Sequence, residues 1–280
     1  MNRFPLIIVM LTLFACKKDK LQFAGSDIYS FNEKPRIHFK LTEELNEISG
    51  LAVDKNDRVF VHNDELGIVY QLDPESAAII KSFRIGRDLI NADFEGIAII
   101  DSLFYMVSSD GIIYEFPEGE DNTFVKFNTY RTDLKTDFNI EGLCYDPKRN
   151  SLLLAAKGTS KKFKDNRVIW EFSLAKKMRL EEPRFLLNVN QITAINSGDK
   201  QFGPSGIEIN PLTGNLFIIA YRGLLILSLN ESGDILTVDK LANHKQPEGI
   251  SFLSNGDCLI ADERNERSAR LSIYAYGKQQ

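Results

Sequence analysis

The amino-acid sequence predicts an all-β fold, a β-propeller of five four-stranded blades closed by an N-terminal strand. Three observations predict it. A short motif recurs five times, short apolar runs separated by turn residues follow each copy, and no stretch shows the periodicity of a helix. The 19 Phe and 9 Tyr residues also favour strands.

The repeated motif has the form polar, any residue, Glu or Ser, Gly, apolar, any residue, apolar. Its five glycines are separated by 46, 46, 64 and 43 residues. The copies are EISGLAV at 47–53, DFEGIAI at 93–99, NIEGLCY at 139–145, GPSGIEI at 203–209 and QPEGISF at 246–252. Repeats of about 40–50 residues without helical periodicity are typical of propeller blades.

Each repeat divides into four short strands. The first predicts strands at 48–53, 58–62, 68–72 and 77–83, and the second at 96–100, 103–107, 112–116 and 124–130. Turn residues at 146–150, 210–215 and 255–256 separate the first strand from the second in the last three repeats. In the third repeat, a fourth strand at 184–189 leaves 190–203 as a loop insertion, and 160–166 forms a second, basic loop.

The last repeat ends one strand short, and residues 36–41 supply a strand before the first repeat. We expect this N-terminal strand to complete the fifth blade, because that pairing removes an exposed sheet edge. Six blades remain the alternative, if the insertion pairs with 21–30.

The first residues have the features of an export signal. Arg3 precedes the apolar run 6–15, which is too short to span a bilayer, and Leu13-Phe14-Ala15-Cys16 resembles a bacterial lipobox. We therefore expect cleavage after residue 15, lipidation of Cys16, a tether over 16–35 and a single domain over 36–280. An ordinary signal peptide or an uncleaved anchor are the alternatives. The lipid would hold the protein in the bacterial cell envelope, at the outer membrane or cell surface rather than the inner membrane.

Composition excludes one class of partner. With 34 Lys and Arg against 39 Asp and Glu, the net charge of −5 excludes a nucleic-acid binder, which needs a basic surface. Cys144 and Cys258 lie in apolar runs of repeats that are not neighbours, so we expect two free buried thiols. We expect a monomer.

The motif places oxygen-bearing side chains at one mouth of the central channel. The residue before each Gly is Ser49, Glu95, Glu141, Ser205 or Glu248, and two residues earlier stand Glu47, Asp93, Asn139, Gly203 and Gln246. Residues two apart on a strand point the same way, so we expect two adjacent rings. Crowded carboxylates take up protons or a cation, and oxygen ligands suit Ca²⁺. The candidate ligands are Glu95, Glu141, Glu248, Glu47 and Asp93. Alternatively, the glutamates join neighbouring blades by accepting backbone hydrogen bonds.

Loops after the second strands form the rim of the same mouth. They carry Asp64, Asp110 and Asp262 on one side and Lys157 and Arg222 on the other. Such a rim suits a cation beside a small anionic ligand, although solvated loop charges are the simpler interpretation of each residue.

The repeated S-G-L-A and P-E-G-I elements, with the G-L-x-Y-D-P and N-P-x-T-G-N-L turns, resemble the SdiA-regulated family of bacterial envelope β-propellers of the YjiK and CarP type. The resemblance extends over roughly residues 36–276. It implies a calcium-binding envelope propeller, and the family has been likened to propeller phytases, but it supplies no established catalytic residues.

Two functions follow. The first is a lipid-anchored binding module for calcium, a protein or another ligand, favoured because the sequence has no G-x-S-x-G, H-E-x-x-H or P-loop motif. The alternative is a calcium-dependent hydrolase of phosphate esters or lactones acting at the channel mouth.

Overall fold

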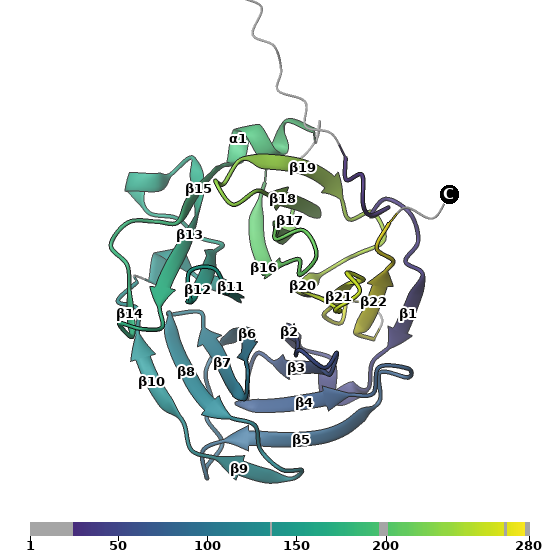
Figure 1. Ribbon diagram of the computed structural model, residues 1–280, viewed down its shortest axis with the longest axis vertical. Helices are drawn as coiled ribbons and strands as arrows, with labels where there is room; N and C mark the ends of the chain where they lie inside the picture. The colour runs from purple at the N-terminus through teal and green to yellow at the C-terminus, as the bar shows by residue number, and fades with distance from the viewer. Residues whose placement is uncertain (1–24, 135, 196–200, 266–267, 278–280) are drawn as a thin grey trace, which may run out of the picture.

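The computed structural model describes residues 25–134, 136–195, 201–265 and 268–277, and they form a five-bladed β-propeller. Figure 1 looks along the propeller axis, with the five sheets arranged around it. The fold class predicted from the repeats is confirmed. The predicted leader over 1–15 and Cys16 lie outside the described residues, and no helix within the described part of the chain is long and apolar enough to cross a membrane.

Blades 1 and 2 are joined at their outer edges. Blade 1 consists of β2 (Ile48–Val53), β3 (Val59–Asn63), β4 (Ile68–Leu72) and β5 (Ile79–Ile85). Blade 2 consists of β6 (Phe94–Ile100), β7 (Leu103–Ser108), β8 (Ile112–Pro117) and β10 (Asn128–Arg131). The single strand predicted at 124–130 is two strands, because β9 (Thr123–Val125) leaves blade 2 and pairs in parallel with β5.

Blades 3 and 4 contain the predicted insertions. Blade 3 consists of β11 (Ile140–Asp146), β12 (Ser151–Ala156) and β13 (Asn166–Ser173), with β14 (Met178–Arg179) and β15 (Phe185–Asn188) both paired to β13. The 190–203 insertion holds α1 (Val189–Ile192) and η4 (Thr193–Ile195), while its residues 196–200 are outside the described part. Blade 4 consists of β16 (Gly203–Ile209), β17 (Leu216–Arg222), β18 (Leu225–Leu229) and β19 (Ile235–Lys240).

Blade 5 closes the ring as predicted. It consists of β20 (Pro247–Phe252), β21 (Cys258–Asp262), β22 (Arg270–Tyr274) and the N-terminal β1 (Ile37–Lys40), which pairs antiparallel with β22 from Ile37↔Ile273 to Lys40↔Arg270. The chain ends are thereby joined within one sheet, which leaves no unpaired strand at the closure.

The chain before β1 also packs onto the propeller. Tyr29 and Phe31 are each 1% exposed, and the Tyr29 hydroxyl donates a hydrogen bond to the Gly256 carbonyl oxygen at 2.5 Å. Asn210 of blade 4 donates to the same hydroxyl at 2.6 Å. Residues 25–35, expected as tether, therefore join blades 4 and 5, because their aromatic side chains bury apolar surface.

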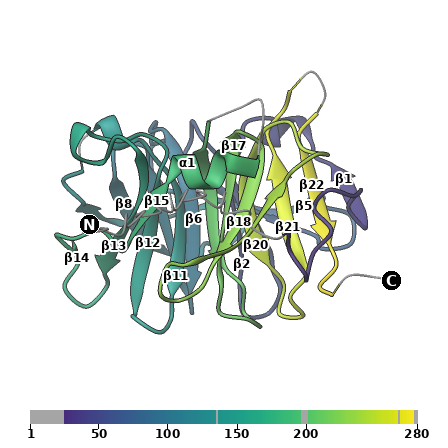
Figure 2. The ribbon, with the colours of Figure 1, turned by 90° about the horizontal axis from the view of Figure 1, so that it is seen from above.

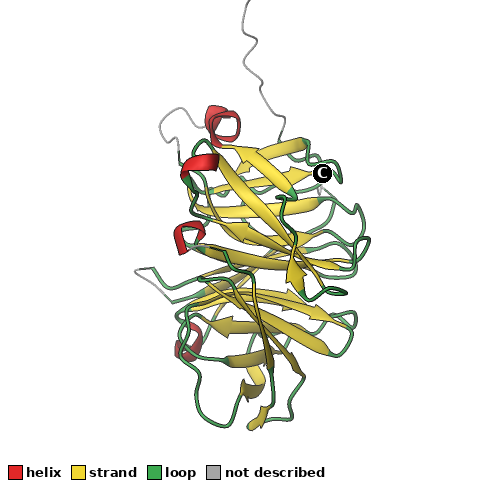
Figure 3. Cartoon of the chain, turned by 90° about the vertical axis from the view of Figure 1, so that its left-hand side faces the viewer, coloured by secondary structure: helices red, strands yellow, loops and turns green. Residues whose placement is uncertain are grey.

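The innermost strands β2, β6, β11, β16 and β20 form a closed ring in which each strand contacts the next. Seen edge-on, the strands run across the thickness of the disc (Figure 2). We call the end where the innermost strands begin the N-terminal rim, and the end where they finish the C-terminal rim. The short helices, including η1 (Glu43–Leu45), η2 (Thr136–Phe138) and η3 (Lys161–Phe163), all lie on one face of the disc (Figure 3).

Apolar clusters fill the spaces between neighbouring blades. One cluster combines Leu153 and Ile169 of blade 3 with Ile218 and Leu227 of blade 4. These strands are apolar on successive residues because both faces of each sheet are covered by a neighbouring blade. Cys144 and Cys258 are buried in this core as free thiols, which confirms the prediction for both.

Candidate functional site at the N-terminal rim

Every innermost strand carries a β-bulge at the residue before the motif glycine. The pairing register with the second strand shifts at the same place in all five blades, between Ile48 and Gly50, Phe94 and Gly96, Ile140 and Gly142, Pro204 and Gly206, and Pro247 and Gly249. The bulged residues are Ser49, Glu95, Glu141, Ser205 and Glu248. A bulged residue has no partner across the ladder, so its side chain leaves the regular pleat.

The motif glycines allow neighbouring innermost strands to approach closely. A Cβ on Gly96 would lie 2.6 Å from the backbone nitrogen of Leu143, and one on Gly249 would lie 2.7 Å from the Cβ of Leu51. None of the five motif glycines has a positive φ. Four of the five glycines are therefore required for packing between blades rather than for a tight turn, whereas a Cβ on Gly50 would meet the His62 ring of its own blade.

Three glutamates from different blades converge at this rim. Glu141 is 3% and Glu248 8% exposed, and Glu95 is partly buried. Burial, followed by the charge of Glu141, raises the pKa of Glu95 to about 10 and that of Glu248 to about 8. Glu141 lies on blade 3 and Glu248 on blade 5, which are not neighbours, so their repulsion acts across the propeller axis. We call Glu95, Glu141 and Glu248 the glutamate cluster.

Lys157 supplies the positive charge of the cluster. It follows β12, and its Nζ lies 3.0 Å from Oε1 of Glu141, with the lysine side chain 20% exposed. Burial alone would lower the pKa of Lys157. The negative charges of Glu141, Glu248 and Glu95 outweigh this effect, so the pKa of Lys157 is raised. For Glu141, burial raises the pKa, and the charge of Lys157 only partly offsets this increase. The sequence placed Lys157 on the rim, and the structure places it among the glutamates.

The two serines at the bulges connect neighbouring blades. The Ser49 hydroxyl donates to Oε2 of Glu95 at 3.2 Å, from blade 1 to blade 2. The Ser205 hydroxyl donates to the Pro247 carbonyl oxygen at 2.5 Å and accepts from the Tyr221 backbone N–H at 3.0 Å. The difference between Ser and Glu at this position therefore follows a difference in role: the serines bridge blades and the glutamates carry charge.

The side chains of the second predicted ring lie in two different places. Asn139 donates a hydrogen bond to Glu141, and Asp93 contributes to the raised pKa of Glu95, so both adjoin the glutamate cluster. Glu47 instead lies with Glu263 and Asp64. Burial, followed by a hydrogen bond with Glu47, raises the pKa of Glu263 to about 7.

The predicted rim residues have separate surroundings. Burial and the charge of Glu47 raise the pKa of Asp64. Asp110 accepts a hydrogen bond from the Ser108 hydroxyl at 2.6 Å. Arg222 lies beside Lys157, since a Cβ on Gly203 would be 3.2 Å from Arg222 and 3.3 Å from Lys157. Arg222 also lines a cleft of about 650 Å³ with Lys240 and Lys245.

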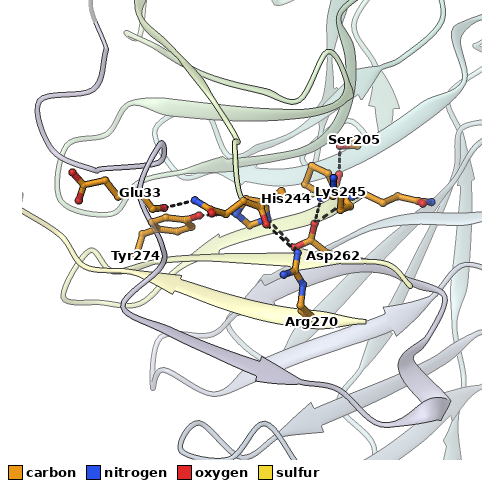
Figure 4. A network of polar contacts seen from close by, with 10 residues as sticks. Glu33, Ser205, His244, Lys245, Asp262, Arg270 and Tyr274 are labelled. Atoms are coloured by element: carbon orange, nitrogen blue, oxygen red, sulfur yellow. Dashed lines mark hydrogen bonds and ion pairs between the residues drawn. The ribbon is translucent and has the colours of Figure 1, made fainter. Parts of the chain in front are cut away.

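Asp262 belongs to a buried network that the sequence did not reveal (Figure 4). Its Oδ2 lies 2.8 Å from Nδ1 of His244, and Nε2 of His244 lies 2.8 Å from the Tyr274 hydroxyl. The three residues are at most 3% exposed. Burial favours the neutral form of Asp262, but the hydrogen bond and charge of His244, the Lys245 backbone N–H and the charge of Arg270 together outweigh this, and the pKa of Asp262 is lowered. Asp262 thus holds the loop before β20, and only the fold brings it together with His244.

The donor chemistry of the glutamate cluster suits a hard cation, because every donor is an oxygen. Within the described ranges, however, no three His, Cys, Asp or Glu side chains are already placed to hold a metal ion together. Cation binding would therefore require the glutamates to move closer.

Solved structures of other proteins share the fold. The glutaminyl cyclase of Myxococcus xanthus is similar over 88% of this chain and 97% of its own, at 13% identity and a TM-score of 0.61. The PQQ-bound aldose sugar dehydrogenase of Streptomyces coelicolor is similar over 87% and 100%, at 11% identity and a TM-score of 0.55. At these identities the similarity concerns the fold alone. No curated protein shows a significant match to this sequence.

A family model gives the sequence-level comparison. The model described as SdiA-regulated matches residues 175–279, a segment that includes the last two motif copies. The resemblance of this chain to the SdiA-regulated family is therefore confirmed, over residues 175–279.

Proposed function

We propose that the protein is a lipid-anchored binding module of the bacterial cell envelope that takes up Ca²⁺ at the N-terminal rim. The observation that carries the proposal is the charge of the glutamate cluster. Three carboxylates face a single lysine, so the fully ionised cluster has a net charge of −2. One divalent cation would neutralise it.

Raised pKa values support the same proposal. With pKa values of about 10 and about 8, Glu95 and Glu248 keep their protons at neutral pH when no cation is bound. A cation that binds carboxylates must displace those protons. Calcium uptake should therefore be coupled to proton release and should weaken as the pH falls.

Calorimetric titration with CaCl₂ tests this proposal. We expect the Glu95→Gln/Glu141→Gln double variant to bind Ca²⁺ at least tenfold more weakly than wild type. Glutamine preserves the size of each side chain and removes its charge. Glu120→Gln, on an exposed loop of blade 2, is the matched control and should bind as wild type does. Equal binding by the double variant and wild type would place any calcium site elsewhere, and absence of binding to wild type would overturn the proposal.

The anchor has its own test. Cys16→Ser removes the thiol that the lipid would modify, so we expect the variant to leave the membrane fraction. Unchanged fractionation of this variant would contradict lipidation at Cys16.

The cleft beside the cluster favours a second candidate, the calcium-dependent hydrolase. Arg222, Lys240 and Lys245 line it, and none of these side chains forms an ion pair with another described residue. Three cationic side chains next to the proposed calcium site suit an anionic substrate such as a phosphate ester. The test is calcium-dependent hydrolysis of p-nitrophenyl phosphate, lost in Arg222→Gln. Activity that is independent of calcium, or unchanged in this variant, would exclude this candidate.

A further inference from the structure

The five-fold repeat is broken at one position by a carboxylate. Two residues after the motif glycine, four blades carry a small side chain and the fourth blade carries a glutamate. The residues are Ala52, Ala98, Cys144, Glu208 and Ser251. Glu208 takes no part in the glutamate cluster. It lies three residues beyond Ser205 on β16, roughly 10 Å further along the strand.

Glu208 lines a cavity at the C-terminal rim. The cavity has a volume of about 260 Å³, and its walls come from the innermost strands of all five blades, at Ala52, Ala98, Tyr145, Glu208 and Ser251. The small side chains of Ala52, Ala98 and Ser251 leave space beside Glu208, while Cys144 of blade 3 is buried in the core and does not line the cavity. A concave site with few polar groups is the usual form of a small-molecule site.

The remaining wall is mostly apolar, with Val53, Ile99, Ile209 and Phe252 among its residues. Two other charged residues border the cavity, and each has a partner. Oδ2 of Asp54 lies 2.7 Å from Nε of Arg58, and Nζ of Lys55 lies 3.6 Å from Oδ1 of Asp101.

Glu208 has no such partner. Its Oε1 accepts a hydrogen bond from the Ile209 backbone N–H at 2.8 Å, and no cationic side chain of the described residues forms an ion pair with it. Burial raises the pKa of Glu208 to about 8. A partly buried carboxyl group without a counter-ion stabilises the fold poorly, which points to a charge supplied from outside.

We propose that this cavity binds a small ligand that carries a protonated amine, with the Glu208 carboxylate as its counter-ion. The ammonium group would pair with Glu208, and the aliphatic part would lie against Ala52, Ile99 and Phe252. An anion would be repelled by the carboxylate, and a neutral molecule would gain only apolar contacts. The site lies at the rim opposite the glutamate cluster, so it does not depend on the calcium proposal.

Titration with butylammonium, monitored by calorimetry, tests the inference. Binding in the millimolar range is expected of so small a ligand. We expect Glu208→Gln to weaken it at least tenfold and to leave the binding of 1-butanol, the neutral molecule of the same shape, unchanged. The Gln oxygen can still accept from the Ile209 N–H, so the local structure is retained. Glu120→Gln, on an exposed loop of blade 2 and outside the cavity, is the control and should bind butylammonium as wild type does.

Backbone amide shifts in wild type provide a measurement that needs no variant. Butylammonium should shift the resonances of Tyr145, Ile209 and Ser251, while those of Ser49 and Ser205 stay unchanged. Equal affinity of wild type and Glu208→Gln for butylammonium would overturn the proposal. So would equal affinity of wild type for butylammonium and 1-butanol, or shifts confined to the N-terminal rim.

Discussion

The ammonium nitrogen of Lys157 lies 3.0 Å from the carboxylate oxygen of Glu141, which is the bulged residue of the innermost strand of blade 3. Both side chains are largely buried, with 20% and 4% of their surfaces exposed. The pair leaves two further glutamates, Glu95 and Glu248, to hold protons or to bind a cation. The behaviour of the N-terminal rim therefore depends on this ion pair.

Removal of Lys157 should destabilise the protein. In Lys157→Met, Glu141 is left buried without its counter-ion, and we expect a loss of about 3 kcal/mol in the free energy of unfolding, measured by urea denaturation. Lys55→Met removes an exposed pair with Asp101 and should cost less than about 0.5 kcal/mol. A Lys157→Met/Glu141→Gln double variant should recover much of the loss. No recovery would show that Lys157 acts through packing.

Replacement of Glu95 should change how stability depends on pH. The pKa of Glu95 is about 10 in the folded protein and lies near 4.5 in the unfolded chain, so the folded state binds more protons between these values. Stability contributed by this proton is present below pH 4.5 and is lost as the pH rises towards 10. Glu95→Gln should match wild type near pH 5 and exceed it by up to about 4 kcal/mol at pH 8. Thermal unfolding across this range measures the difference, and parallel curves would contradict the raised pKa.

Alanine at the motif glycines should show which atoms limit the approach of neighbouring blades. In Gly96→Ala, the new Cβ meets the backbone nitrogen of Leu143 at 2.6 Å, and we expect a loss of about 3 kcal/mol. In Gly142→Ala the nearest backbone atom, the nitrogen of Ile207, is 3.2 Å away and a methyl group of the same residue is at 3.0 Å, so the smaller loss of about 1 kcal/mol is expected. Chemical denaturation compares the two variants, and equal losses would argue against the distance to the neighbouring backbone as the cause.

The buried network of His244 should contribute to stability without affecting the N-terminal rim. Tyr274→Phe removes the hydroxyl 2.8 Å from Nε2 of His244 and leaves that nitrogen without its partner. We expect a loss of about 1–2 kcal/mol in unfolding free energy. Calcium affinity should stay unchanged, and a weakened affinity would mean that the network positions the glutamate cluster.

The sequence was sufficient to predict the ring. The repeated glycine and the turns marked the blades, and β1 closes blade 5 as its strand pattern indicated. Features that depend on contacts between distant segments were not predictable. The pairing of β9 with blade 1, the packing of Tyr29 between blades 4 and 5, and the hydrogen bonds from His244 to Asp262 and Tyr274 all require the three-dimensional arrangement.

The candidate site, too, was predictable only in part. The alternation of Glu and Ser before the motif glycine identified the bulged positions, because the five copies can be compared with one another. The bulge itself, which turns these side chains out of the pleat, gives no local signal in the sequence. The position of Lys157 among the glutamates could not be inferred either, since Lys157 follows the second strand of blade 3 and lies outside the motif.

The central claim is that Ca²⁺ replaces protons on the glutamate cluster. The most direct test is calorimetric titration with CaCl₂ at pH 7 in two buffers of different ionisation enthalpy, which counts the protons released for each ion bound. Glu95 and Glu248 both hold protons at this pH, so we predict the release of about two protons per ion. Binding with the same enthalpy in both buffers, and therefore without proton release, would contradict the claim.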